Sequence, residues 1–143
     1  MLRSDFVWVN FDEQFVTTNP EASRTFQIDG KPVGTGYLLI QAFDVNGTGH
    51  RILINGHDLP SFDIPPQEGN GRWTTWMDRI PPTYLCQGRN TITIRAASGT
   101  EPPGPLYVPD PFFVANVVIH WRENDNDGPG SIVDFESPST TPG

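Results

Sequence analysis

Two tryptophans, Trp73 and Trp76, stand three residues apart in a segment that alternates in character. If this segment is a β-strand, successive side chains point to opposite faces, so one indole ring enters the core and the other stays outside. An exposed indole ring can stack on the apolar C–H face of a sugar while polar groups beside it bind the hydroxyls. The segment therefore predicts a carbohydrate-binding platform.

Polar residues next to each tryptophan would complete such a platform. The candidate ligand-binding residues are Asn70, Arg72, Trp73, Trp76, Asp78 and Arg79. Either Trp76 acts with the two charged residues that follow it, or Trp73 acts with the polar residues before it. The alternative is that both rings pack beneath the preceding loop, since large aromatic side chains are mostly buried in small β-sandwiches. Two further tryptophans, Trp8 and Trp121, are predicted to lie in the core.

Catalytic patterns are missing from the sequence, which has neither a glycine-rich phosphate loop nor a serine in a nucleophile motif. Four carboxylates surround one long loop: Asp58, Asp63, Glu68 and Asp78. They could supply the pair that glycoside hydrolysis needs, but solvated loop acids are the simpler interpretation in a segment rich in Pro and Gly. We therefore expect a module without catalytic activity.

Two sets of residues could ligate a metal ion, one with histidines and one with oxygen ligands alone. His50, His57 and Asp58 would suit a borderline metal, but strand parity separates the two histidines, and surface histidines are the simpler interpretation. Hard oxygen ligands for a structural Ca²⁺ occur in two loops. The candidates are Asp44, Asn46, Asp125 and Asp127. Turn formation explains the same residues, so we expect no cofactor.

The charge balance excludes several partners. The 143 residues carry 17 acidic and nine basic side chains, a formal net charge of −8, so we expect no nucleic-acid binding. No apolar run approaches the ~20 residues of a membrane span, and residues 1–10 lack the apolar core of a signal peptide. We expect no membrane insertion, and a cytoplasmic or virion location if the sequence is full length. Cys86, the one cysteine, is predicted to be a small buried side chain.

Short alternating segments, separated by many of the 14 Gly and 15 Pro, are typical of an all-β domain. The predicted strands are 5–9, 25–28, 36–43, 50–55, 73–77, 90–96, 112–121 and, as an eighth, 106–108. Segments 36–43 and 50–55 are predicted to form a hairpin around Asn46 and Gly47. Long loops at 59–72 and 98–111 are expected to cross between sheets. We predict a single antiparallel β-sandwich of jelly-roll type, with seven or eight strands and long Pro/Gly-rich loops.

Alternation also predicts which side chains enter the core. In strand 90–96, Ile92, Ile94 and Ala96 share the core face. In strand 112–121, one face is expected to hold Phe113, Ala115, Val117, Ile119 and Trp121. The opposite face of that strand is mixed, so we expect the strand to be central and largely covered.

Three motifs follow one another between residues 36 and 122. They are Arg51-Ile-Leu-Ile-Asn-Gly56, the tryptophans Trp73 and Trp76, and Leu85-Cys-Gln-Gly-Arg-Asn-Thr-Ile-Thr-Ile94. This succession resembles the galactose-binding-domain-like jelly rolls, which include many carbohydrate-binding modules. The resemblance implies a jelly-roll fold with carbohydrate as the ligand. In physical terms, Gly56 and Gly88 permit turns with positive φ, and Asn90 can hydrogen-bond local backbone at the entry to a strand.

The composition changes after Glu123, where Asn, Asp, Gly, Pro, Ser and Thr take over. We predict a β-sandwich domain over 1–123 and an acidic, flexible C-terminal tail over 124–143. Ile132, Val133 and Phe135 in that tail are candidates for docking on a neighbouring subunit. Two functions stay open: a carbohydrate-binding module, or a structural subunit of a larger assembly such as a phage capsid decoration or another virion surface protein.

Overall fold

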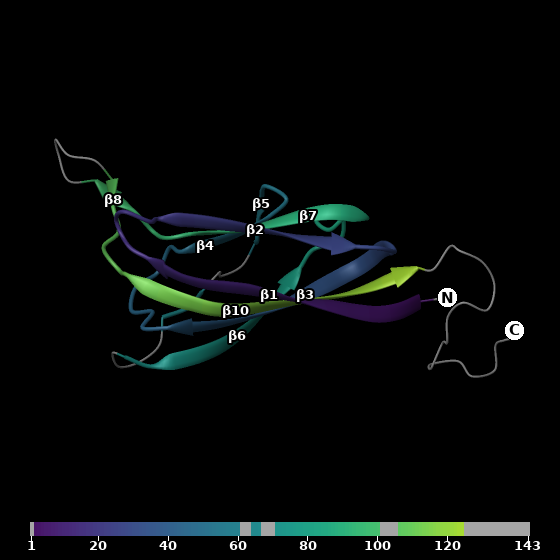
Figure 1. The fold of residues 1–143 in the computed structure, drawn as a ribbon, viewed down its shortest axis with the longest axis horizontal. Helices are drawn as coiled ribbons and strands as arrows, with labels where there is room; N and C mark the ends of the chain where they lie inside the picture. The colour runs from purple at the N-terminus through teal and green to yellow at the C-terminus, as the bar shows by residue number, and fades with distance from the viewer. Residues whose placement is uncertain (1, 61–63, 67–70, 101–105, 125–143) are drawn as a thin grey trace, which may run out of the picture.

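Two antiparallel four-stranded sheets form the computed structural model, which describes residues 2–60, 64–66, 71–100 and 106–124 (Figure 1). The strands are β1 Leu2–Phe15, β2 Glu21–Ile28, β3 Lys31–Phe43, β4 Arg51–Ile54, β5 His57–Asp58, β6 Trp73–Ile80, β7 Gly88–Arg95, β8 Gly99–Thr100, β9 Leu106–Tyr107 and β10 Phe112–Asn124. Sheet I has the order β1-β10-β3-β6, sheet II has the order β2-β7-β4-β5, and β8 and β9 pair separately. The described residues form no helix that could cross a membrane.

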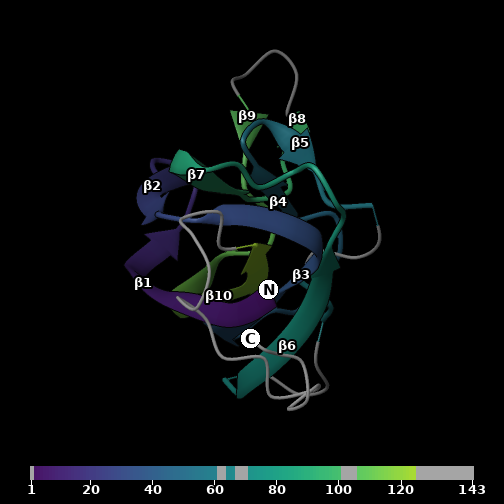
Figure 2. The ribbon, with the colours of Figure 1, turned by 90° about the vertical axis from the view of Figure 1, so that its right-hand side faces the viewer.

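The two sheets pack face to face, as the end-on view shows (Figure 2). Side chains from both inner faces fill the space between them, as expected for a sandwich. The largest fully buried side chains are Phe11, Phe15, Ile28, Leu38, Ile40, Ile52, Ile54, Ile80, Ile92, Ile94, Phe112 and Ile119. The predicted all-β sandwich is therefore confirmed, with eight strands in its two sheets.

Both long connections cross between the sheets, as predicted. Residues 59–72 lead from β5 in sheet II to β6 in sheet I, and residues 96–111 lead from β7 to β10. The predicted hairpin of 36–43 with 50–55 is wrong, because β3 belongs to sheet I and β4 to sheet II. The connecting loop reverses through positive φ values at Asp44 and Gly49, and so carries the chain across the sandwich.

A β-bulge changes the predicted faces of β10. The pairing of β10 with β3 shifts between Val114 and Asn116, so Ala115 is an extra residue and the alternation restarts after it. Phe112 and Val114 are consequently buried, while Phe113, predicted for the core face, is only partly buried. Beyond the bulge, Val117, Ile119 and Trp121 point inward as predicted.

Two asparagines tie the turns at one end of sheet II. The Asn55 side-chain amide donates to Oδ1 of Asn90 and to the carbonyl of Tyr84, both at 2.8 Å, and its oxygen accepts from the N–H of Thr91. Asn90 is fully buried and donates to the carbonyls of Cys86 and Gly88. These hydrogen bonds join the motif that contains Asn55 to the motif that contains Asn90. We call this network, centred on the two asparagines, the structural lock.

Positive φ values of 83° at Gly56 and 100° at Gly88 confirm the predicted turn geometry at both ends of this lock. Cys86 lies in the second of these turns and is exposed. The prediction of a buried thiol is therefore wrong, because the neighbouring Leu85 takes the inward position.

Arg24 of β2 connects the two sheets where β1 is irregular. The pairing of β1 with β10 shifts between Asn10 and Glu13, and the guanidinium of Arg24 donates to the carbonyls of Asn10 and Phe11 in this region. Arg24 also donates to the carboxylate of Glu13 at 2.7 Å. That hydrogen bond, with a second from Asn19, lowers the pKa of Glu13.

Asn90→Ala tests the structural lock. The substitution removes both halves of a buried amide and leaves its partners without hydrogen bonds, at a cost of about 1–3 kcal/mol for each unsatisfied group. We expect the free energy of unfolding to fall by about 3 kcal/mol in urea titrations. The matched substitution Gln27→Ala, at an exposed position of β2, should change it by less than about 0.5 kcal/mol. Equal losses in the two variants would contradict the assignment.

Candidate functional site

The outer face of sheet I is built from four rows of side chains, each crossing all four strands. The rows are Phe6 with His120, Tyr37 and Arg79; Trp8 with Val118, Leu39 and Met77; Asn10 with Asn116, Gln41 and Thr75; and Gln14 with Phe113, Phe43 and Trp73. The row that begins with Asn10 is polar, and the other three rows are rich in aromatic or aliphatic groups. This outer face is the candidate ligand-binding surface.

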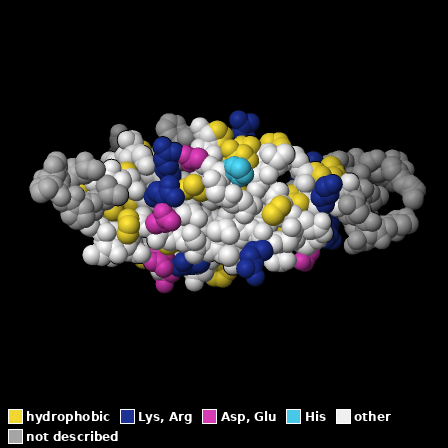
Figure 3. All heavy atoms as spheres, turned by 90° about the horizontal axis from the view of Figure 1, so that it is seen from above, with side chains coloured by type: hydrophobic (Ala, Val, Ile, Leu, Met, Phe, Trp, Pro, Cys, Tyr) yellow, Lys and Arg dark blue, Asp and Glu magenta, His cyan; other side chains and the backbone are white. Residues whose placement is uncertain are grey.

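Large exposed hydrophobic side chains concentrate on this outer face. Among the described residues, the exposed large hydrophobics are Phe6 at 61%, Trp8 at 61%, Tyr37 at 43%, Trp73 at 53% and Met77 at 58%, and all belong to these rows. The outer side of sheet II differs, because none of these five residues belongs to it. Figure 3 shows charged and hydrophobic side chains scattered there among other side chains and backbone. Antiparallel sandwiches ordinarily expose polar side chains on outer faces, so the apolar face of sheet I needs an explanation.

A chain of hydrogen bonds crosses the centre of the outer face. The indole N–H of Trp8 donates to Oδ1 of Asn116 at 2.8 Å, and the amide of Asn116 donates to Oε1 of Gln41 at 3.1 Å. Three side chains from β1, β10 and β3 are thereby held in one line. The indole ring of Trp8 is fixed in place although it is exposed, which lowers the entropy lost on binding.

Trp73 forms one corner of the face with two phenylalanines. Its ring centroid lies 5.1 Å from that of Phe43 and 6.0 Å from that of Phe113. Asp44, directly after β3, holds the chain that enters this corner, because its carboxylate accepts from the N–H of Gly71 and its N–H donates to the carbonyl of Arg72. The Gly71 hydrogen bond, with one from Asn46, lowers the pKa of Asp44.

The structure separates the predicted ligand-binding residues. Trp73 and Arg79 lie on the outer face, and Arg72 is exposed just before β6. Trp76 points the other way and packs against the core. The prediction that one of the two rings enters the core is therefore confirmed, and the alternative that both are packed away is wrong. Asn70 lies outside the described residues.

Asp78 also points away from the outer face and is buried. Its carboxylate accepts from the N–H of Arg79, and the two residues line a pocket of about 280 Å³ with Thr35, Pro60, Pro81 and Pro82. None of the described residues that line this pocket is aromatic. The predicted combination of Trp76, Asp78 and Arg79 as one platform is consequently not formed.

Most of the outer face was not predicted from the sequence. Trp8, predicted in the core, is exposed because Val7 and Val9 take the inward positions of β1. Phe6, Tyr37 and Met77 were not among the predicted binding residues. A signal was available in residues 6–9, where large apolar side chains occupy both parities of one strand.

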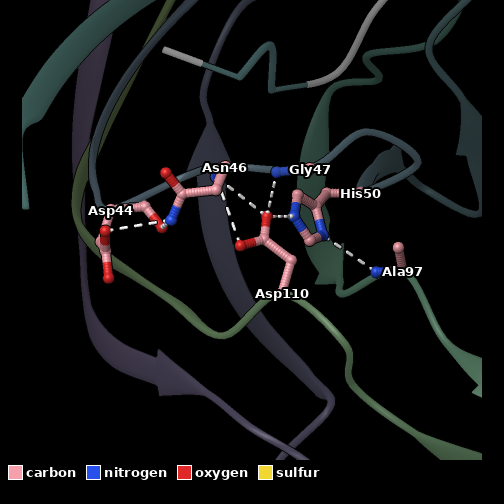
Figure 4. Close-up of polar contacts among 6 residues, drawn as sticks. All are labelled: Asp44, Asn46, Gly47, His50, Ala97 and Asp110. Carbon is pink, nitrogen blue, oxygen red and sulfur yellow. Dashed lines mark hydrogen bonds and ion pairs between the residues drawn. The ribbon is translucent and has the colours of Figure 1, made fainter. Parts of the chain in front are cut away.

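A second polar cluster closes the end of the sandwich (Figure 4). The carboxylate of Asp110 accepts from the N–H of Gly47 at 2.6 Å, from the N–H of Asn46, and from Nε2 of His50 at 2.8 Å. Nδ1 of His50 accepts from the N–H of Ala97. Both imidazole nitrogens are thus engaged, and the hydrogen bond that Nδ1 accepts places the proton of the neutral ring on Nε2.

This cluster changes two predictions. His50, predicted at the surface, is buried, whereas His57 is exposed as predicted. The calcium candidates Asp44 and Asn46 bond to each other and to nearby backbone, and the part of the chain that the structure describes contains no group of three His, Cys, Asp or Glu suited to a metal. Asp125 and Asp127, with the docking candidates Ile132, Val133 and Phe135, lie outside the described residues.

The chain is similar to several solved structures. Dimeric latent PorU from Porphyromonas gingivalis has a TM-score of 0.60 and 10% identity, over 86% of this chain and 13% of that one. A cycloisomaltooligosaccharide glucanotransferase of Paenibacillus sp., complexed with cycloisomaltoheptaose, has a TM-score of 0.50 and 9% identity, over 78% and 18%. A family 35 carbohydrate binding module from an environmental isolate scores 0.45 with 17% identity, over 70% and 66%.

At these identities the likeness shows the fold alone, and the chain spans less than a fifth of the first two proteins. The chain is a jelly-roll β-sandwich module, as the resemblance to galactose-binding-like domains predicted. It belongs to a family of unknown function, DUF7383, whose sequence profile matches residues 4–123. No curated protein matches the sequence.

Asp44 gives a pH-dependent prediction. Because the pKa of Asp44 is lowered, its carboxylate is protonated, and loses the hydrogen bond from Gly71, at a lower pH than an ordinary aspartate, whose pKa is about 3.9. We expect the amide resonance of Gly71 to titrate with a midpoint below about 3.9. In Asp44→Asn this titration should vanish. A midpoint at or above 3.9 in the unmodified protein would refute the contact.

Proposed function

We propose that the chain is a non-catalytic carbohydrate-binding module that binds its ligand on the outer face of sheet I. One observation carries the proposal. A polar row, centred on Asn116 and Gln41, lies between one row that exposes Trp8 and another that exposes Trp73. Aromatic faces offer stacking for pyranose rings, and amides offer hydrogen bonds to hydroxyls. The two requirements of sugar recognition thus meet on one rigid sheet.

The size of the face favours a small ligand over a protein partner. Four strands about 4.8 Å apart and four rows about 6.7 Å apart cover roughly 500 Å². A stable protein interface buries about 800 Å² on each partner. The face is therefore too small for a lasting protein contact by itself and large enough for a short oligosaccharide.

Affinity at one such face is expected to be modest. A sugar that stacks on one ring covers about 100 Å², worth about 2.5 kcal/mol before the costs of association. Several copies on one particle or polysaccharide would raise the overall binding strength. The module thus suits repeated display along a carbohydrate surface.

Trp73→Ala and Trp8→Ala test the proposal directly. Both rings are exposed, so we expect each variant to keep the free energy of unfolding within about 1 kcal/mol while losing at least tenfold in affinity for retained polysaccharides. Affinity gel electrophoresis with soluble neutral and acidic polysaccharides provides the measurement. Gln27→Ala, on the outer side of sheet II, is the matched control and should bind as the unmodified protein does.

Other outcomes would count against carbohydrate recognition. If no polysaccharide retards the unmodified protein, the proposed ligand is wrong. If the protein instead forms large particles by light scattering, and deletion of 124–143 disperses them, the structural-subunit alternative is favoured. Retention that survives both tryptophan substitutions would place the site elsewhere on the molecule.

A further inference from the structure

The hydrogen-bond chain on the outer face has a direction that chemistry fixes. The indole nitrogen of Trp8 can only donate, so the atom of Asn116 that faces it must be the oxygen. The NH₂ group of Asn116 then faces Gln41, and the atom of Gln41 that receives it must again be the oxygen. The remaining end of the Gln41 amide is therefore its NH₂ group.

This NH₂ group is a donor without a partner among the described residues. The exposed side chain of Gln41 belongs to β3, between Asn116 of β10 and Thr75 of the edge strand β6. Along β3, Phe43 flanks it on one side and Leu39 on the other. A group that is held at one end and free at the other presents its N–H bonds to a ligand lying between the apolar rows.

The charges around Gln41 define the ligand further. No charged residue belongs to the three rows that begin with Trp8, Asn10 and Gln14. Charged side chains such as Arg72 and Arg79 stand at the margins of the outer face. A carboxylate or sulfate placed against the centre would lose hydration without gaining a counter-charge, which is costly.

We infer that the ligand is an uncharged glycan and that Gln41 determines this specificity by donating hydrogen bonds to a hydroxyl or ring oxygen of the sugar. The inference rests on the proposed function and names the class of carbohydrate for the same site. Trp8 and Asn116 act as positioning residues, because they set which end of the Gln41 amide faces the ligand.

Gln41→Glu is the sharpest test, because it changes the free group and preserves the rest. One carboxylate oxygen still accepts from Asn116, but the other presents an acceptor and a negative charge where the NH₂ group was. We expect affinity for hydroxyethyl cellulose, galactomannan or xylan, whichever is retained, to fall at least tenfold. Gln27→Glu adds the same charge to sheet II and should bind normally.

Asn116→Asp tests the direction of the chain through a different residue. An aspartate accepts from Trp8 but cannot donate to Gln41, so the Gln41 amide must turn and present its oxygen outward. We expect weaker binding of the same neutral polysaccharide. In the free protein, NMR should show the Gln41 side-chain NH₂ exposed to solvent in the unmodified chain and hydrogen-bonded in Asn116→Asp.

The outcomes separate the inference from the function on which it rests. Binding of neutral polysaccharides that Gln41→Glu abolishes supports both. Preferential binding of polygalacturonate overturns the ligand class, and unchanged neutral binding in Gln41→Glu overturns the role of Gln41. Both results leave carbohydrate recognition in place. Failure of every polysaccharide overturns both. An unmodified protein whose Gln41 NH₂ is already hydrogen-bonded refutes the donor assignment without reference to any ligand.

Discussion

The β-bulge at Ala115 decides which side chains of β10 face outward, and the whole outer face of sheet I depends on it. Because side chains alternate with a period of two, one extra residue moves everything beyond it to the opposite face. Without the bulge, Val114 inside would place Asn116 and Val118 inside as well. The polar row would then be buried between the sheets, and Trp8 would lose the acceptor that orients its ring.

The alternation of residues along the sequence predicted those features that neighbouring residues alone determine. The core face of β7, the turns at Gly56 and Gly88, and the opposite orientations of Trp73 and Trp76 follow from alternation and backbone geometry within a few residues. The outer face could not be predicted in the same way, because its rows join strands distant in sequence. Neither their register nor the bulge leaves a mark in composition. The wrong hairpin has the same origin, since the partner of β3 is set by long-range packing.

The two sheets differ in the side chains that they expose to solvent. Sheet II obeys ordinary alternation, with residues such as Thr25 and Gln27 outside and Phe26 and Ile28 inside. Sheet I exposes large apolar side chains on its outer side as well, although only its inner side is covered within the described part of the chain. The fold therefore does not require the exposed rings for its own stability, and the hydrophobic free energy of their burial is available to whatever covers them.

The ends of the domain meet at one place. Leu2 pairs with Asn124, and Arg3 binds the buried carboxylate of Glu123. This carboxylate also accepts a hydrogen bond from the indole N–H of Trp121. It lies so close to Gly30 that a side chain at that position would collide with it. The start of β1 and the end of β10 are thus held together at one end of sheet I (Figure 1). A domain joined in this way can be grafted into a surface loop of an unrelated scaffold as a pendant, since its insertion does not force the flanking segments apart.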